Sequence, residues 1–107
     1  MKKNAQIEVL TSEPQENPEV FYARFKNQLD VEHHFPENYI FKFVIPADTK
    51  KVALLHQIFD HNAASFSIKE SKNAKYMSVT VIIYAVDSTS VIEYYKEAAK
   101  IENIIML

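Results

Sequence analysis

The clearest pattern in the chain is an alternation of side chains along two segments, residues 39–45 and 76–85. Both segments are rich in β-branched and aromatic residues, which is typical of β-strands. Along the second segment one face is wholly apolar, whereas the other mixes apolar residues with Ser, Thr and Tyr. We therefore expect one face of a sheet to lie beneath helices and the other to be at least partly open. Shorter strands are predicted at 65–70 and 101–107.

A helix is predicted to begin at Asn17-Pro18-Glu19 and to end before Pro36. Asn is a good N-cap, Pro suits the first turn, and an acid there complements the helix dipole. Phe21, Phe25 and Leu29 then recur four residues apart and form a narrow apolar stripe. Three large apolar side chains exposed together favour aggregation, so we expect this stripe to pack on the rest of the domain.

Two further helices alternate with the strands. One begins at Asp48 or Thr49 and is expected to end near Asn62, with apolar residues at a spacing of three or four. The other begins within 87–90, where Ser90 and Glu93 have the spacing of a capping box.

The order after residue 38 is therefore β, α, β, β, α, β, and the sequence predicts an α+β, ferredoxin-like fold with a four-stranded antiparallel sheet plus an N-terminal helix. We divide the chain into a mobile N-terminal tail (1–17), an N-terminal amphipathic helix (18–34) and the ferredoxin-like domain (35–107). An alternation at Ile7 and Val9 within the tail is compatible with a frayed edge strand. The second face of the sheet is left for a partner, a ligand or an extra element, and the N-terminal helix is the obvious candidate to cover it.

Composition excludes several kinds of chemistry. The chain has no Cys, which removes disulfides, thiolate metal sites and thiol nucleophiles, and no Gly, which removes the phosphate-binding loops of nucleotide enzymes. The net charge is −2, so we do not expect nucleic acid as a partner. The start of the chain has no apolar signal segment and we expect neither a membrane partner nor export, which leaves a cytoplasmic location.

Alternative sites receive little support. His56 and His61 are five residues apart and would lie on different sides of a helix, so we predict neither a metal nor any other cofactor. No nucleophile motif surrounds any Ser, and we predict no catalytic residues. The run Lys75-Tyr76-Met77-Ser78-Val79-Thr80 lacks the glycine and second aromatic ring of an RNA-recognition strand.

The mixed face of the sheet holds the one unexplained group of polar residues. Lys42 lies between Ile40 and Val44 on the first strand, and Ser78 and Thr80 lie on the third. A lysine and two hydroxyls among apolar neighbours are suited to a small anion with an apolar tail, so we predict that Lys42, Ser78 and Thr80 bind a ligand.

A set of motifs covering residues 20–107 resembles the YbeD-like family of short bacterial proteins. The resemblance rests on Phe35-Pro36, Tyr39, Phe41-Lys42-Phe43 and Pro46, on Lys75-Tyr76 with Ser78-Val79-Thr80, and on Lys100-Ile101-Glu102 to Met106-Leu107, with Phe21-Tyr22 to Gln28-Leu29 similar to an extension found in part of the family. The resemblance implies a fold similar to the regulatory ACT domains, which bind small effectors at subunit interfaces, and the family has been described as lipoate-binding regulators. Members usually carry glycine where this chain has Ala74, which argues against a positive φ at that turn.

Two functions remain open. The first is a non-enzymatic regulatory module that binds a small carboxylate-containing metabolite, such as a lipoate-like molecule, on its sheet face or at the interface of a homo-oligomer. The alternative is an adaptor that docks a larger protein through a sheet edge or through the N-terminal helix.

Overall fold

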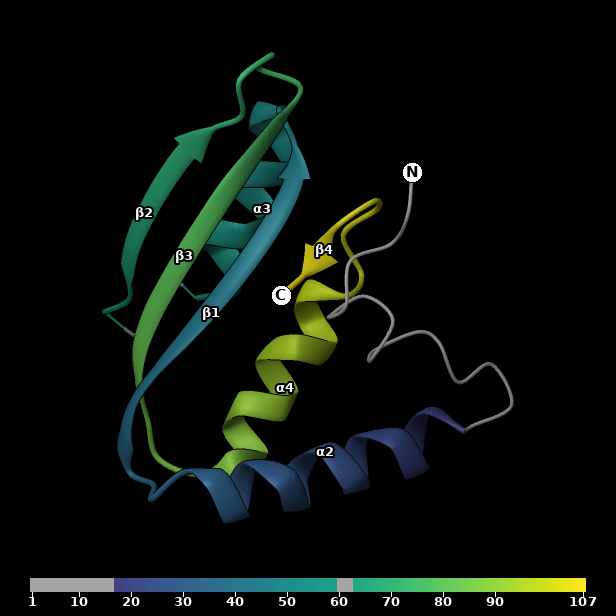
Figure 1. The fold of residues 1–107 in the computed structure, drawn as a ribbon, viewed down its shortest axis with the longest axis vertical. Coiled ribbons are helices and arrows are strands. Elements are labelled where there is room, and N and C mark those ends of the chain that lie inside the picture. Colours follow the sequence, from purple (N-terminus) through teal and green to yellow (C-terminus); the bar gives the residue numbers. More distant parts are fainter. Residues whose placement is uncertain (1–16, 60–62) are drawn as a thin grey trace.

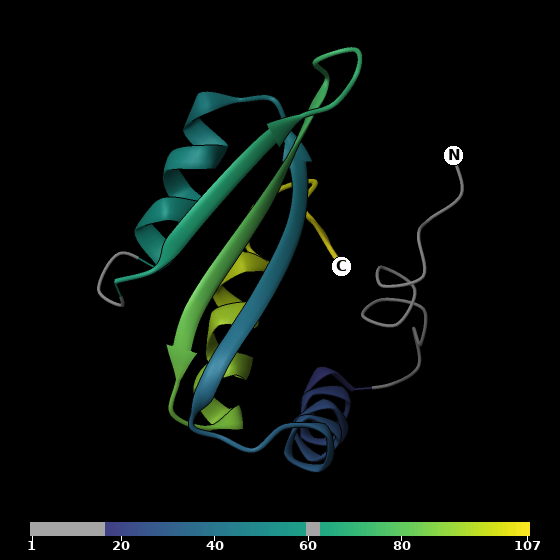
Figure 2. The same ribbon diagram turned by 60° about the vertical axis from the view of Figure 1, so that its left-hand side comes forward.

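The computed structural model describes residues 17–59 and 63–107 and has three helices and four strands in this part of the chain. The strands form one antiparallel sheet in the order β2-β3-β1-β4, and the helices α3 and α4 lie together on one face of it (Figures 1 and 2). This is the predicted ferredoxin-like βαββαβ fold with an N-terminal helix. The elements are α2 (Pro18–Glu32), β1 (Glu37–Pro46), α3 (Thr49–Ile58), β2 (Ser65–Glu70), β3 (Tyr76–Ala85), α4 (Ser88–Ala98) and β4 (Ile105–Met106).

The centre of the sheet is a long pair of strands. β1 and β3 pair over ten residues each, from Glu37 opposite Ala85 to Pro46 opposite Tyr76. β2 pairs with β3 over six residues, whereas β4 pairs with β1 only at Phe43 and Val44. The alternation in β1 and β3 directs every second side chain towards α3 and α4, which explains why these positions are buried.

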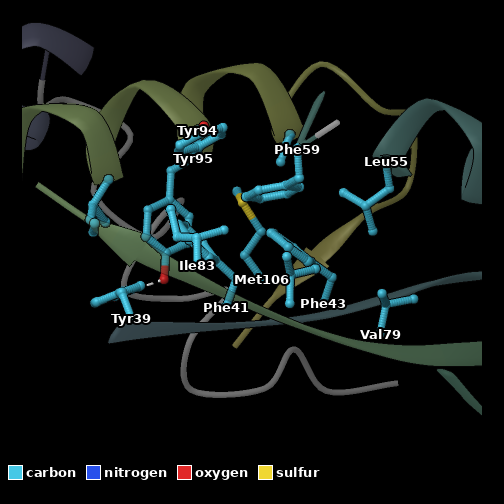
Figure 3. Close-up of a cluster of buried hydrophobic side chains, with 14 of the residues drawn as sticks. Tyr39, Phe41, Phe43, Leu55, Phe59, Val79, Ile83, Tyr94, Tyr95 and Met106 are labelled. Atoms are coloured by element: carbon cyan, nitrogen blue, oxygen red, sulfur yellow. Dashed lines mark hydrogen bonds between the residues drawn. The ribbon is translucent and has the colours of Figure 1, made fainter. Parts of the chain in front are cut away.

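Aromatic rings fill the space between the sheet and the two helices (Figure 3). Phe59 lies with its ring centroid 5.0 Å from that of Phe41 and stacks on Tyr94 at 4.7 Å. The hydroxyl groups of Tyr39 and Tyr95 are buried and hydrogen-bonded to each other at 3.0 Å. Burial raises the pKa of Tyr95 far above its usual value, so both hydroxyls stay neutral.

The N-terminal helix begins as predicted, because Asn17 Oδ1 accepts a hydrogen bond from the Glu19 amide at 2.7 Å. Its apolar stripe also packs on the domain: Leu29 is 3% exposed, and the Phe25 ring lies 5.3 Å from that of Tyr95 on α4. A side-chain hydrogen bond from Ser88 to the Asp30 carboxylate joins the two helices as well and lowers the pKa of Asp30.

The prediction that this helix covers the second face of the sheet is wrong. α2 packs against α4, which belongs to the helical layer, and lies beyond the end of the sheet where β1 begins (Figures 1 and 2). The physical reason is that α4 and the second face of the sheet offer different surfaces to the apolar stripe. On α4 the stripe meets the aromatic ring of Tyr95. On the second face it would have covered the Lys42 ammonium group and removed it from water without supplying a partner.

Three predicted boundaries also change. The N-cap of α4 is Asp87, whose Oδ1 accepts from the Ser90 amide at 2.8 Å, so Ser90 lies inside the helix and is not the start of a capping box. The final strand is shortened to Ile105–Met106, because turns with hydrogen bonds from the Ile101 and Ile104 amides occupy the residues before it. The second helix ends at Ile58, before the segment 60–62, which lies outside the described residues together with the predicted tail up to residue 16.

The turn between β2 and β3 contains a residue with a positive φ, although its lack of glycine argued against one. Ala74 has a φ of 58° and so takes the left-handed conformation that glycine adopts at little cost. The turn is closed by hydrogen bonds from the Ser71 amide to the Tyr76 carbonyl (2.8 Å) and from the Ala74 amide to the Ser71 carbonyl (3.0 Å). These hydrogen bonds hold Ala74 in a conformation that glycine adopts more readily.

Candidate functional site

The face of the sheet that faces away from α3 and α4, called the open face below, brings the three predicted ligand-binding residues together. Lys42 on β1 is directly opposite Thr80 on β3, and Ser78 is opposite Val44, one step along the same face. Opposite pairs on one face of an antiparallel sheet have Cβ atoms about 4.5–5.5 Å apart. Lys42, Thr80 and Ser78 therefore form one contiguous group.

The second strand extends this group in a way that we did not predict from the sequence. Ser67 is opposite Thr80, and Lys69 is opposite Ser78, so a second ammonium group and a third hydroxyl lie on the open face. The alternation within Ser65–Glu70 already separates these two residues from Phe66 and Ile68. Only the register between β2 and β3 places them beside the predicted group.

Apolar side chains lie on both sides of the polar group. Ile40 and Ile82 are opposite each other at one side, and Ile40 is 52% exposed. At the other side Val44 is opposite Ile105 of β4. An apolar chain a few carbon atoms long can therefore contact the face while its polar end reaches the lysine.

The open face has an unbalanced charge. Its described strand residues include Lys42 and Lys69 but no Asp or Glu, and Lys42 forms no ion pair with any described residue. A carboxylate held on this face would meet a positive charge and hydroxyl donors without a competing anion.

A cavity of about 430 Å³ lies elsewhere, between the C-terminal parts of α3 and α4. Apolar side chains of Leu54, Ile58 and Ile101 line it, and Lys100 at its rim forms an ion pair with Glu97 at 3.0 Å. This lining suits an apolar side chain or methyl group. It includes no hydroxyl, thiol or imidazole.

A second cavity, of about 420 Å³, lies where α2 leads into β1. His33, at its edge, has Nδ1 2.6 Å from the Glu37 carboxylate, and this hydrogen bond is the main reason why the pKa of Glu37 is lowered. The His34 amide also donates to Glu37. These contacts fix the connection between helix and strand, which is a structural task.

Histidines elsewhere do not form a metal site in the described residues, where no three His, Cys, Asp or Glu side chains are grouped to hold an ion. His56 stacks on Phe66 of β2 with ring centroids 3.9 Å apart. His61 lies outside the described residues. Within residues 17–59 and 63–107, no helix is long and apolar enough to cross a membrane.

Fold and site together define a small ferredoxin-like α+β domain with one sheet face covered by helices and the other covered by no described helix. Residues 30–107 match the model of the family described as "Protein of unknown function (DUF493)", and the chain belongs to this family. YbeD-like proteins belong to the same family, so the resemblance seen in the sequence is confirmed. No curated protein and no solved structure matches the chain.

Proposed function

We propose that this protein is a small, non-enzymatic regulatory module that binds a carboxylate-containing metabolite with an apolar tail on the open face of its sheet. The observation that carries the proposal is the position of Lys42, directly opposite Thr80 on a face whose described strand residues include no acid. In this proposal Lys42 pairs with the carboxylate, while Ser78 and Thr80 donate hydrogen bonds to it.

The apolar part of the ligand supplies much of the affinity. An ion pair exposed to water contributes only about 0–1 kcal/mol, so the lysine alone cannot hold a metabolite. Burial of apolar surface against Ile40, Ile82 and Val44 adds roughly 25 cal/mol per Å². A second chain placed over the face would exclude water from the ion pair and strengthen it, which is why we include the subunit interface in this proposal.

A thermal-shift titration with three matched compounds tests the proposal. Lipoate and octanoate carry a carboxylate and an apolar tail, whereas lipoamide has the tail of lipoate without the charge. We expect saturable stabilisation by one or both acids, of about 2.7 kcal/mol when the ligand is at a hundredfold excess over its Kd, and little by lipoamide.

Variants decide whether the site is the one proposed. Lys42→Ala should abolish the stabilisation, while Lys72→Ala, in the connection after β2, should leave it unchanged. Equal shifts for the two variants, or no shift with any carboxylate in a wider metabolite panel, would remove the proposal.

The second candidate, a protein adaptor, is favoured by the edge strand β2. Its outer side pairs with no described strand, and Ile68 in its middle is 44% exposed. Such an edge can accept a strand from another protein. The helical version of this candidate has less support, because Leu29 is buried and the Phe25 ring packs on Tyr95 of α4.

Affinity capture from native lysate tests the adaptor. A partner bound at the edge should be retained in stoichiometric amount by the unaltered protein and lost with Ile68→Lys, since a lysine in an edge strand disfavours pairing. Ser67→Lys, which places the same charge on the open face, is the matched control. Recovery of the bait alone would argue against this function.

A further inference from the structure

The charged residues of the sheet are separated by sign between its two faces. Among the described residues, the strands hold two acids, Glu37 on β1 and Glu70 on β2, and two bases, Lys42 on β1 and Lys69 on β2. The alternation of side chains places both acids on the side of α3 and α4 and both lysines on the open face. The sheet therefore concentrates positive charge on one face.

The two lysines lie on opposite sides of β3. Lys42 is opposite Thr80 across one side of this strand, and Lys69 is opposite Ser78 across the other. Two strand spacings and one step of two residues separate the lysine Cα atoms, which corresponds to about 12 Å. Because a lysine carries its ammonium group on a flexible four-carbon stem, both groups can reach an anion held over Ser78 and Thr80.

Polar and apolar side chains of the open face belong to different strands. β2 contributes Ser67 and Lys69, whereas β1 contributes Ile40 and Val44 on either side of Lys42. A ligand on this face would therefore place its head group over β3 and β2 and its apolar tail along β1. The head group would lie among hydroxyl groups and two positive charges, and one carboxylate can neutralise only one of these charges.

We infer that the ligand carries a second acidic group, which pairs with Lys69 while the carboxylate pairs with Lys42. This inference rests on the proposed function and narrows its ligand to dianions. In the described part of the chain neither ammonium group forms an ion pair, so neither charge is already neutralised. A dicarboxylic acid with an apolar chain is the simplest member of this class, because charge-assisted hydrogen bonds can form at both of its ends.

A chemical-shift titration of the full-length chain by NMR tests the inference with two matched compounds at pH 8. 2-Octylsuccinate has two carboxylates, and decanoate has the same apolar chain with only one of them. Both compounds are fully ionised at this pH. We expect the amides of Ser78 and Thr80 to shift with each compound. The dicarboxylate should bind about fivefold more tightly, the factor that a favourable ion pair exposed to water provides.

Variants assign the additional affinity to Lys69. Lys69→Gln should bind 2-octylsuccinate no more tightly than decanoate, whereas Lys69→Arg, which retains the charge, should keep the preference for the dicarboxylate. Lys42→Gln should weaken the binding of both compounds. Lys72→Gln, in the connection between β2 and β3, is the matched control and should change neither Kd.

The outcomes for the second acidic group and for the proposed function can be told apart. Equal Kd values for the two compounds in the unaltered protein, or a preference that survives Lys69→Gln, would overturn the second acidic group. Binding of decanoate that depends on Lys42 would still support the proposed function in that case. Absence of saturable binding by both compounds would overturn the inference and would count against the proposed function as well.

Discussion

Replacing Ala74 with glycine should stabilise this protein, although glycine usually weakens a fold. Ala74 has a φ of 58°, in the left-handed region that costs an L-residue roughly 1–2 kcal/mol. Glycine adopts this conformation without that cost but loses about 0.5–1 kcal/mol more in backbone entropy on folding. The difference predicts a net gain of about 0.5–1 kcal/mol for Ala74→Gly.

The turn should keep its geometry in the variant, because its hydrogen bonds do not involve the alanine methyl group. They include the Ser71 amide to the Tyr76 carbonyl and the Lys75 amide to Asn73 Oδ1 at 3.2 Å. The side chain of Ala74 is exposed, so its removal leaves no cavity.

Urea unfolding at 25 °C followed by circular dichroism measures the effect. The midpoint should rise without a change of slope, and Tm should rise by about 2–6 °C for a chain of this size. Ala53→Gly, at an exposed position inside α3, is the control and should lose about 1 kcal/mol. If Ala74→Gly loses as much stability as Ala53→Gly, the argument from the backbone conformation is refuted.

Three further predictions concern stability. Leu29→Ala removes a buried side chain from the stripe of α2 and should lower the free energy of unfolding, measured in urea, by about 2–4 kcal/mol. Val31 is 80% exposed on the same helix, so Val31→Ala should cost less than about 0.5 kcal/mol. Similar losses for the two variants would mean that α2 does not pack on the domain. Tyr39→Phe should cost about 1–2 kcal/mol of stability, because it leaves the buried Tyr95 hydroxyl without its hydrogen-bond partner. The double variant that removes both hydroxyls should lose less stability than the sum of the two single variants. Additive losses would contradict this reasoning. The hydrogen bond from His33 lowers the pKa of Glu37 in the folded state. The stabilisation that this hydrogen bond supplies is therefore present above pH 4.5 and is lost as the pH falls through the lowered pKa. Glu37→Gln should flatten the decline of Tm below pH 4.5, and an unchanged decline would exclude this contribution.

Local physics explains which features could be predicted from the sequence. The alternation along 39–45 and 76–85 fixes which side chains share a face, because a strand has a period of two whatever its neighbours. Asn17 and Pro18 mark the start of α2 through contacts within the first turn of the helix itself. The grouping of Lys42 with Ser78 and Thr80 followed from the same alternation together with the ferredoxin-like order of strands.

What the sequence could not determine depends on contacts between distant segments. The addition of Lys69 and Ser67 to the open face requires the register between β2 and β3, which alternation alone leaves undecided. The predicted N-cap of α4 was wrong because Asp87 and Ser90 are both suitable N-cap residues. The path of the chain out of β3 selects Asp87. Ala74 takes a positive φ because closing the turn between two paired strands outweighs the preference of a single residue.

The position of α2 shows this division most clearly. Its amphipathic pattern determined that Phe21, Phe25 and Leu29 would be buried, since exposing them costs free energy in any arrangement. The pattern contains no information about the partner, which is Tyr95 and its neighbours on α4 and not the sheet. The sequence by itself therefore determined the elements and their faces, while the tertiary structure decided which surfaces meet, and so placed α2 away from the face that carries Lys42. That choice depends on the shapes and charges of surfaces assembled from residues far apart in the chain.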